Sequence, residues 1–338
     1  MLDYVGKVGG ASSISRQFYE DVKNDENNQW IFLTNKEYVS QKSNIKRILV
    51  NNANKTFLHR FYFETFKIPN IINNIKPDLV LSLQNLGVKP KQNQILYIHQ
   101  ALPFQNKLWE LSNNPISLVK MLLMKYKLIK DIKKSNHIIV QTNYMKKLIE
   151  KYNNNIIVNL PNFNFASPQT HKDTKDFLYP TNAQKYKGLN YIVDFARILK
   201  KNKQNVYINL TLIGNENKYI ENIRKIINKE QLAIRFIGRQ NSDEMNELYK
   251  LNNLLFTSQV ESLGLPLIEA AHYGCKIFAY ETDVTKEVLK NYKFKVFFNK
   301  SNIESKYKEF LSFPPTTIGE NINGLNINGI LRTNHIIK

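Results

Sequence analysis

Two glutamates that flank a proline-containing turn are the residues of this chain best placed to do chemistry. Glu261 and Glu269 are separated by seven residues. Pro266 between them favours the start of a helix, because its missing N–H would have no partner in the first turn. Gly264 precedes the proline and lets a ligand approach the backbone closely. The amides of residues 263–265 therefore front a helix N-terminus, which attracts anions through its N–H groups and its dipole.

Phosphate is the anion that such a helix start most naturally binds. The amides expected to bind it belong to Leu263, Gly264 and Leu265. A carboxylate repels phosphate, so Glu261 and Glu269 are predicted to accept hydrogen bonds from hydroxyl groups instead. A diphosphate with hydroxyls on both sides describes a nucleotide-sugar. The alternative is an ordinary strand–turn–helix in which the two acids complement the helix dipole.

Short apolar runs alternate with helical patterns along the chain, which predicts parallel sheets of the α/β class. The predicted strands cover residues 30–34, 78–83, 95–100, 137–142, 155–160, 177–179, 207–213, 233–237, 254–258 and 276–280. The predicted helices include residues 11–23, 143–152, 189–200 and 242–249. Residues 161–176, rich in Pro, Ser, Thr and Asn, form the best predicted linker. We expect two Rossmann-like, doubly wound domains over residues 1–163 and 164–338, with ligands at the carboxyl ends of the strands.

The segment around the two glutamates resembles the signature of a known family. The apolar strand 254–258 is followed by the two acids, Gly264 and Pro266 in the order found in retaining, GT-B-fold glycosyltransferases of family 4. The chain departs from that signature at Ser262 and Leu263, where the family has glycine and phenylalanine. The resemblance implies a GT-B fold. In that fold an N-terminal acceptor-binding domain and a C-terminal nucleotide-sugar-binding domain face each other across a cleft.

The resemblance runs from about residue 9 to residue 288 and includes two sites in the first domain. Gly9-Gly10 before a predicted helix resembles the glycine loop that closes over the donor phosphates, which assigns Gly10 to donor binding. The alternative is a tight turn that needs glycine. His99 ends a predicted buried strand, where the family has a histidine that hydrogen-bonds a hydroxyl of the transferred sugar. The alternative for His99 is a structural histidine in the core.

Lys187 and Gly188 match half of a family motif in which two cations clamp the donor diphosphate. The position of the other cation, an arginine in the family, falls at Thr181 or Asn182. Lys185 is a possible source of the second charge. The alternative for Lys187 is a solvated lysine at the start of a helix.

The two ends of the chain also depart from the family pattern. Residues 1–5 make a poor first strand, whereas the family has a full apolar strand before its glycine loop. The sequence after residue 312 is rich in Asn and Gly, and it lacks the long helix that the family carries back to its first domain.

The sequence predicts chemistry without a metal and without a cofactor. It contains no Asp-x-Asp triplet and no His, Cys, Asp or Glu cluster with metal-ligand spacing. The leaving diphosphate must then be stabilised by the amides of residues 263–265 and by Lys187. The resemblance implies a retaining hexosyltransferase in which the acceptor attacks from the same face. It places Glu261 and His99 at the transferred sugar and Glu269 at the nucleoside.

The formal net charge of +20 calls for an anionic partner, and residues 41–134 hold 16 Lys and Arg against 4 Asp and Glu. Nucleic acid is not expected, because the chain has no zinc spacing, no RNP-like motif and no dense basic run. An anionic membrane surface fits better, because residues 118–134 predict a basic amphipathic helix. The lysines assigned to this surface are Lys120, Lys125, Lys127 and Lys130. The alternative is a surface helix whose apolar stripe lies in the core.

Localisation follows from composition. No run approaches the eighteen or so apolar residues of a membrane span, and no signal peptide is recognised. The single cysteine, Cys275, excludes an internal disulfide and fits a reducing cytoplasm. The chain is therefore expected at the inner face of the cytoplasmic membrane.

These observations predict a retaining glycosyltransferase that moves a sugar from a nucleotide-sugar to a lipid-linked glycan. The expected acceptor is an undecaprenyl-diphosphate-linked glycan in the synthesis of a bacterial surface polysaccharide, such as O-antigen or capsule. One alternative is a glycosyltransferase that acts on a soluble acceptor. Another is a non-catalytic scaffold that binds nucleotide-sugar.

Overall fold

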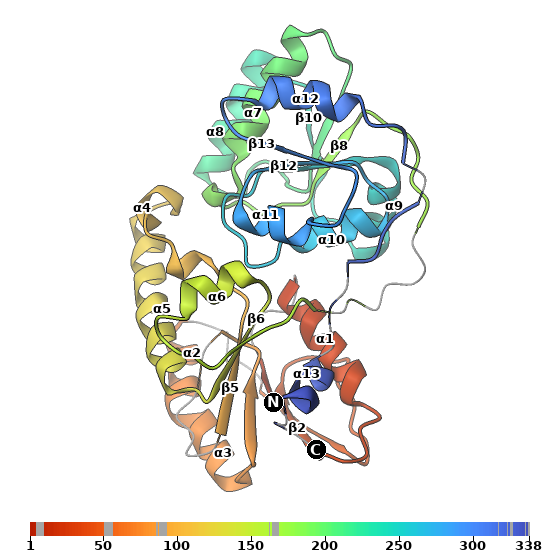
Figure 1. Ribbon diagram of the computed structural model, residues 1–338. Helices are drawn as coiled ribbons and strands as arrows, with labels where there is room; N and C mark the ends of the chain where they lie inside the picture. Colours follow the sequence, from red (N-terminus) through yellow and green to blue (C-terminus); the bar gives the residue numbers. More distant parts are fainter. Residues whose placement is uncertain are drawn as a thin grey trace. The chain divides into compact units, whose positions relative to one another are not determined.

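The chain folds into two compact units, which are described separately (Figure 1). The computed structural model describes residues 1–4, 10–50, 57–85, 87, 93–161, 163, 169–316, 318–322, 324, 327–334 and 336. The first unit comprises residues 1–104, 121–164 and 323–338, and the second comprises residues 105–120 and 165–322. Each unit contains one parallel β-sheet, so the predicted α/β class is confirmed.

The sheet of the first unit has seven parallel strands in the order β3-β2-β1-β4-β5-β6-β7. The strands are β1 (Leu2–Asp3), β2 (Trp30–Thr34), β3 (Ile45–Leu49), β4 (Leu79–Ser82), β5 (Asn93–Ile98), β6 (His137–Val140) and β7 (Ile156–Val158). The helices are α1 (Gly10–Val22), α2 (Phe57–Tyr62), the π-helix η1 (Phe63–Lys67), α3 (Ile68–Ile75), the short 3-10 helix η2 (Leu102–Phe104), α6 (Asn143–Ile149) and α13 (Ile327–Thr333). Helix α5 (Pro115–Lys134) contributes its residues from Met121 onward. The strand order reverses between β1 and β4, which is where ligands bind in open sheets of this kind.

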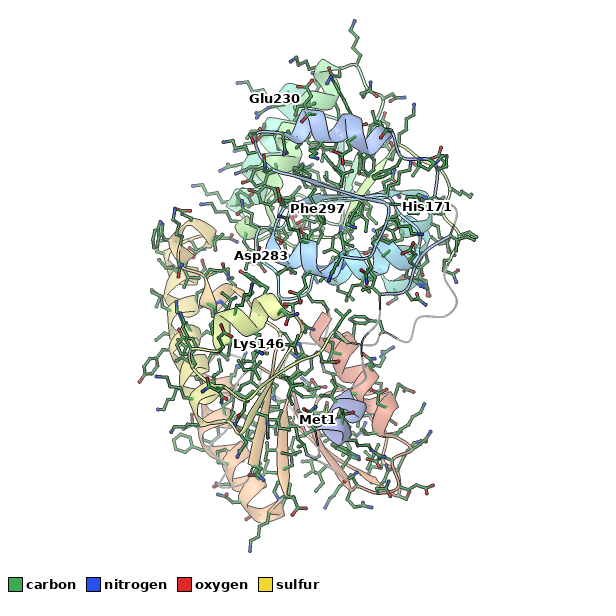
Figure 2. All side chains as sticks on the ribbon, in the orientation of Figure 1. Met1, Lys146, His171, Glu230, Asp283 and Phe297 are labelled. Atoms are coloured by element: carbon green, nitrogen blue, oxygen red, sulfur yellow. The ribbon has the colours of Figure 1, made fainter. Side chains whose placement is uncertain are left out.

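The first strand is central even though it has only two residues. Leu2 and Asp3 are 1% and 3% exposed, and backbone hydrogen bonds from Leu33 to Met1 and from Leu83 to Leu2 hold the strand on both sides. The ammonium group of Met1, labelled in Figure 2, donates to the carbonyl of Ile31 at 2.6 Å. The expectation that residues 1–5 make a poor first strand was therefore wrong. Burial between two neighbours stabilises a segment too short to show a pattern.

The sheet of the second unit has six parallel strands in the order β10-β9-β8-β11-β12-β13. The strands are β8 (Phe177–Tyr179), β9 (Ile208–Leu210), β10 (Ile234–Phe236), β11 (Asn253–Phe256), β12 (Ile277–Tyr280) and β13 (Lys295–Phe298). The helices are α4 (Leu108–Leu111), the 3-10 helix η3 (Lys185–Lys187), α7 (Leu189–Lys201), α8 (Lys218–Glu230), α9 (Ser242–Leu251), α10 (Leu265–His272), α11 (Asp283–Val288) and α12 (Ile303–Leu311). The strand order reverses between β8 and β11, so the segments that follow these two strands are the candidate ligand-binding segments.

The predicted division at residues 163 and 164 lies one residue from the point where the chain passes into residues 165–322. The C-terminal residues differ from the prediction, because residues 323–338 belong to the first unit. Helix α13 packs beside α1 (Figure 1), with Ile330 and Leu331 only 2% and 0% exposed. Arg332 also pairs with Asp25 at 2.8 Å. The C-terminal segment therefore does pack on the first unit, through the short helix α13. The sequence had suggested only that the long helix of the family is missing.

Within the described ranges, no helix is long and apolar enough to cross a membrane.

Candidate active site

The short helix α10 begins at the proline turn. Gly264 caps it with a φ of 74°, and Pro266 occupies the second helical position. This left-handed conformation favours glycine, and a Cβ at residue 264 would also lie 2.9 Å from a methyl of Leu267. Gly274 follows the helix with a φ of 73°, in the left-handed conformation that the sequence predicts. The amides of residues 263–265 thus precede the helix at the carboxyl end of β11.

Lys187 and Glu261 form an ion pair beside this helix start. Nζ of Lys187 lies 2.5 Å from Oε1 of Glu261, and the two side chains are only 14% and 17% exposed. Burial is the largest single influence and lowers the pKa of Lys187, but Glu261, Tyr179 and Tyr186 together outweigh burial and raise it. The lysine is therefore a fixed cation. Sequence reasoning assigned these residues to different parts of the donor, and the structure brings them together.

The backbone around Lys187 is held by the neighbouring strands. The carbonyl of Lys187 accepts hydrogen bonds from the hydroxyl of Tyr179 at 2.8 Å and from that of Thr257 at 2.9 Å. Gly188 follows with a φ of 69°, and a Cβ there would lie 2.2 Å from the carbonyl oxygen of Thr257. Because only glycine allows this approach, the position of Lys187 is determined by the contact between η3 and the end of β11.

The loop before Lys187 is fixed by two asparagines that sequence reasoning missed. Asn113 donates to the carbonyl of Ala183 at 3.0 Å and accepts from the backbone N–H of Lys185 at 2.9 Å. Asn217 donates to the same carbonyl of Ala183 at 2.7 Å. The side chain of Lys185 itself is exposed. Asn113 precedes these partners by about 70 residues, so no local pattern could have identified it.

Glu269 lies in the middle of α10 and accepts a hydrogen bond from the hydroxyl of Tyr249 at Oε2, at 2.7 Å. Burial raises the pKa of Glu269, and the tyrosine hydroxyl opposes that shift. Tyr249 was not among the predicted residues. The two predicted glutamates therefore have different partners, a cation for Glu261 and a phenol for Glu269.

His99 follows strand β5 in the first unit. Its ring stacks on Tyr97 with centroids 4.5 Å apart, and its Nε2 lies 3.1 Å from the carbonyl oxygen of Leu83. Burial lowers the pKa of His99 to about 4, although the carbonyl favours the protonated ring. The ring is therefore neutral at physiological pH. With its proton on Nε2 toward Leu83, its Nδ1 is a hydrogen-bond acceptor.

The predicted glycine loop is only partly described. Gly10 begins helix α1, whereas Gly9 lies outside the described residues. Within the described part of the chain, no group of three His, Cys, Asp or Glu could hold a metal ion. Cys275 is buried and donates from Sγ to the carbonyl of Tyr249 at 3.1 Å.

Helix α5 has two apolar faces, not the single stripe that the sequence suggests. Among the apolar residues of the predicted amphipathic helix 118–134, Met121, Leu128 and Ile132 are buried in the core. A second face of the helix is between 49% and 71% exposed and consists of Ile116, Val119, Leu122, Leu123 and Tyr126. Lys120 and Lys130 are exposed, and Lys125 is half-buried.

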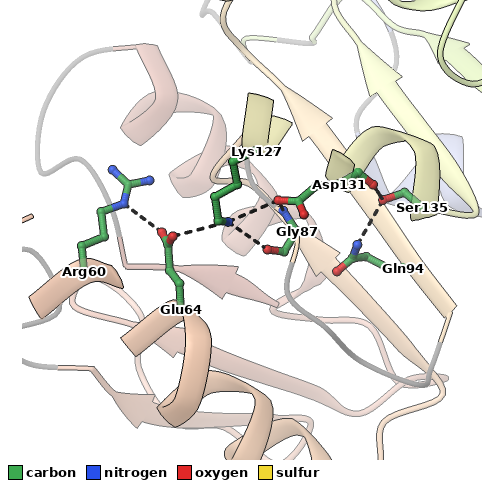
Figure 3. Close-up of polar contacts among 7 residues, drawn as sticks. All are labelled: Arg60, Glu64, Gly87, Gln94, Lys127, Asp131 and Ser135. Carbon is green, nitrogen blue, oxygen red and sulfur yellow. Dashed lines mark hydrogen bonds and ion pairs between the residues drawn. The ribbon is translucent and has the colours of Figure 1, made fainter. Parts of the chain in front are cut away.

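Lys127, the remaining predicted lysine, pairs with two carboxylates of the first unit (Figure 3), although 35% of its side chain is exposed. Its Nζ lies 3.2 Å from Oδ2 of Asp131 and 3.5 Å from Oε2 of Glu64 on the π-helix η1. Arg60 pairs with the other oxygen of Glu64 at 2.8 Å. Lys127 thus holds η1 against α5, and it is a poor candidate for contact with lipid.

Comparisons with known proteins agree with this architecture. Residues 161–313 match the model of the family Glycosyl transferases group 1. An uncharacterized glycosyltransferase of Haemophilus influenzae is 27% identical over 135 residues, which are 39% of this chain and 37% of that protein. The chain therefore aligns with little more than a third of this curated relative.

Solved structures resemble the chain over most of its length. The crystal structure of Anabaena HepE in complex with UDP-glucose has a TM-score of 0.63 at 11% identity, and the match covers 92% of this chain and 88% of that one. The crystal structure of WaaG, a glycosyltransferase involved in lipopolysaccharide biosynthesis, has a TM-score of 0.59 at 11% identity over 93% and 90%. At these identities the similarity shows the fold, which is GT-B with two Rossmann-like parallel-sheet units.

The buried imidazole of His99 predicts a pH-dependent stability. Because its pKa is lowered to about 4, the unfolded chain binds this proton more strongly than the folded chain does. The neutral ring therefore contributes to the free energy of unfolding above the ordinary histidine pKa of about 6.5. This contribution, up to about 3 kcal/mol, is lost as the pH falls toward 4. Urea unfolding at several pH values should show that His99→Gln loses less unfolding free energy at low pH than wild type does. The exposed His59→Gln serves as a control, and an unchanged slope in His99→Gln would contradict the assignment.

Proposed function

We propose that this chain is a glycosyltransferase of the group 1 type, which transfers a sugar from a nucleotide-sugar to a lipid-linked glycan with retention of configuration. The ion pair between Lys187 and Glu261 at the start of α10 carries the proposal. It puts a cation for the diphosphate and a carboxylate for sugar hydroxyls beside one helix N-terminus. HepE, whose fold this chain shares, has been crystallised with UDP-glucose, which supports a donor of this class.

Donor binding requires Lys187 to exchange one partner for another. The charge of Lys187 is neutralised by Glu261, whose Oε1 lies 2.5 Å from Nζ. A diphosphate carries more negative charge than one carboxylate, and the amides of residues 263–265 add N–H donors on the same side. Once Lys187 bonds to phosphate, Glu261 becomes available to the hydroxyls of the transferred sugar. Binding of the diphosphate and of the sugar are thereby coupled through a single ion pair.

The proposed chemistry breaks the bond between the anomeric carbon and the diphosphate oxygen and forms a bond to the acceptor hydroxyl on the same face. Lys187 and the amides of residues 263–265 stabilise the negative charge that develops on the leaving diphosphate. A phosphate oxygen accepts the proton of the acceptor hydroxyl. Glu261 and Glu269 do not resemble the close carboxylate pair of a retaining hydrolase, because Lys187 holds one and Tyr249 the other. No metal is required in this scheme.

The exposed face of α5 supports a membrane-bound acceptor. Apolar and aromatic side chains on this face are followed toward the end of the helix by Lys130, Lys133 and Lys134, all exposed. Phe66 of η1 and Tyr62 of α2 are also about half exposed, and the Lys127 contacts hold η1 beside α5. Aromatic and aliphatic groups beside lysines suit the interface of an anionic bilayer. We infer that the chain acts peripherally at the inner face of the cytoplasmic membrane, on a glycan linked to undecaprenyl diphosphate, in the synthesis of a surface polysaccharide.

A thermal-shift screen tests the donor class. Ligands that bind only the folded state raise the melting temperature by mass action, so one of the UDP- or GDP-sugars should do so. Slow release of UDP or GDP from that donor would then demonstrate turnover. Tight binding without release would make the chain a scaffold, and the absence of any shift would contradict the proposal.

Glu261→Gln should separate nucleotide binding from transfer. Removing the carboxylate frees Lys187, so affinity for the nucleoside diphosphate should be retained or increased. Donor hydrolysis and transfer should fall about a hundredfold or more, because the contact to the transferred sugar is lost. Glu281→Gln is a matched control, because it breaks a more exposed ion pair in the same unit, with Lys286 at 2.5 Å. Full activity in Glu261→Gln would overturn its assignment to the sugar.

Replacing Lys120, Lys130 and Lys133 with glutamate should release the protein from anionic vesicles in co-sedimentation. Added salt should weaken wild-type binding as well, because exposed charges are screened over about 10 Å at 0.1 M. Donor hydrolysis should persist, since none of the three lysines is among the residues assigned to the donor. Lys127 is left unchanged, because its replacement would break the contacts of Figure 3.

The matched control for the membrane experiment reverses three exposed lysines of α8 in the second unit, namely Lys218, Lys225 and Lys229. This control changes the net charge by the same amount, so it should leave vesicle binding largely intact. If both variants lose vesicle binding equally, the effect comes from net charge alone. If vesicle binding changes neither in the two variants nor with salt, the membrane proposal is wrong.

A further inference from the structure

A buried tyrosine contacts Glu269, the glutamate that the resemblance to glycosyltransferases places at the nucleoside. Tyr249 lies near the end of α9, twenty residues before Glu269 in the chain. Its hydroxyl donates to Oε2 of Glu269 at 2.7 Å, and only 1% of the residue is exposed. Such a contact fixes one oxygen of the carboxylate and leaves the other oxygen with its acceptor capacity.

Two further contacts hold Tyr249 in this position. Its ring stacks on the ring of Tyr273, with centroids 5.7 Å apart and planes inclined by 11°. Its carbonyl oxygen accepts a hydrogen bond from Sγ of Cys275 at 3.1 Å. The phenol cannot turn away from Glu269 without losing the stacking contact and its burial. Its hydroxyl is therefore a rigid donor.

We propose that Tyr249 is a positioning residue for the recognition of ribose. By occupying Oε2 of Glu269 it orients the carboxylate so that Oε1 accepts hydrogen bonds from the neighbouring hydroxyls of a nucleoside diphosphate. The inference rests on the proposed function, because it takes Glu269 as the group that contacts the nucleoside. A free carboxylate would rotate and lose part of this geometry on binding.

The same contact favours the ionised form of Glu269. Burial raises the pKa of Glu269, and the hydrogen bond from Tyr249 lowers it. The titratable groups that face this cluster within the described residues are Tyr249 of α9, Tyr273 after α10 and Cys275, with Glu247 acting on Tyr273. No cation is among them, so the tyrosine hydroxyl is the group in this cluster that favours the charged carboxylate. Loss of the hydroxyl should raise the pKa of Glu269 further.

The test is calorimetric titration of wild type and Tyr249→Phe with UDP, GDP and inorganic pyrophosphate between about pH 5 and pH 8. Whichever nucleotide wild type binds should bind about tenfold more weakly to Tyr249→Phe, as expected when a hydrogen bond to a charged group is lost. Affinity should also begin to fall at a higher pH than in wild type, because the carboxylate protonates earlier. Pyrophosphate, which has no ribose, should bind the two proteins equally.

Two other variants separate positioning from a structural effect. Tyr273→Phe removes a hydroxyl from the stacked ring and leaves the bond to Glu269 in place, so its nucleotide affinity and pH profile should match wild type. Glu269→Gln should bind nucleotide weakly and show only the pH dependence that comes from the phosphate of the nucleotide, whose second pKa is about 6. Tyr249→Phe should add nothing in that background. If Tyr249→Phe folds poorly, the comparison of wild type with Glu269→Gln still shows whether the carboxylate titrates during nucleotide binding.

Unchanged nucleotide affinity and pH profile in Tyr249→Phe would overturn the inference. An equal loss for nucleotide and pyrophosphate would also overturn it, because the residue would then support the whole site and not the ribose contact. Failure of the proposed function gives a different result, in which wild type binds neither UDP nor GDP at any pH.

Discussion

The close approach of η3 to the end of β11 is the constraint on which the proposed donor site depends. Gly188 has no side chain, and a Cβ at this position would lie 2.2 Å from the carbonyl oxygen of Thr257. That approach lets the hydroxyls of Thr257 and Tyr179 bind the carbonyl of Lys187. The strand order reverses between β8 and β11, so two segments far apart in sequence meet at one edge of the sheet. The ion pair of Lys187 with Glu261 is a consequence of this backbone contact.

Buried charges make this arrangement costly unless each has a partner. A paired lysine and glutamate lose hydration that their attraction only partly restores, so such pairs seldom persist for stability alone. Here the pair stands beside a helix start that favours an anion, and a diphosphate would satisfy both the lysine and the amides. Glu269 is treated differently, because a neutral phenol holds it. The cation, Lys187, thus lies beside the proposed phosphate site. The second carboxylate, Glu269, can still accept hydrogen bonds from hydroxyls.

The sequence identified those parts of the molecule that repeat a local pattern. Strands β8 to β12 of the second unit, the turn at Gly264 and Pro266 and the start of α7 after Gly188 each have a local cause in residue type and spacing, whereas β13 was not predicted. The two-residue strand β1 and the edge strand β3 show no apolar run, and their place in the sheet depends on neighbours that are distant in sequence. Asn113 and Tyr249 were missed for the same reason, because their partners are 70 and 20 residues away. The two faces of helix α5 were not predicted, because a helix with two apolar faces has the same composition as one with a single broad stripe.

Helix α10 also connects the candidate site to two of the four points where the chain passes between the units, those near residues 165 and 322. Its C-terminal carbonyls accept hydrogen bonds from the backbone of Gln169 at 3.2 Å and of Glu320 at 2.8 Å. Gly319 lies so close that a Cβ would be 1.8 Å from the carbonyl oxygen of His272. The residues just inside both connections are therefore attached to one end of an eight-residue helix whose other end fronts the proposed phosphate site.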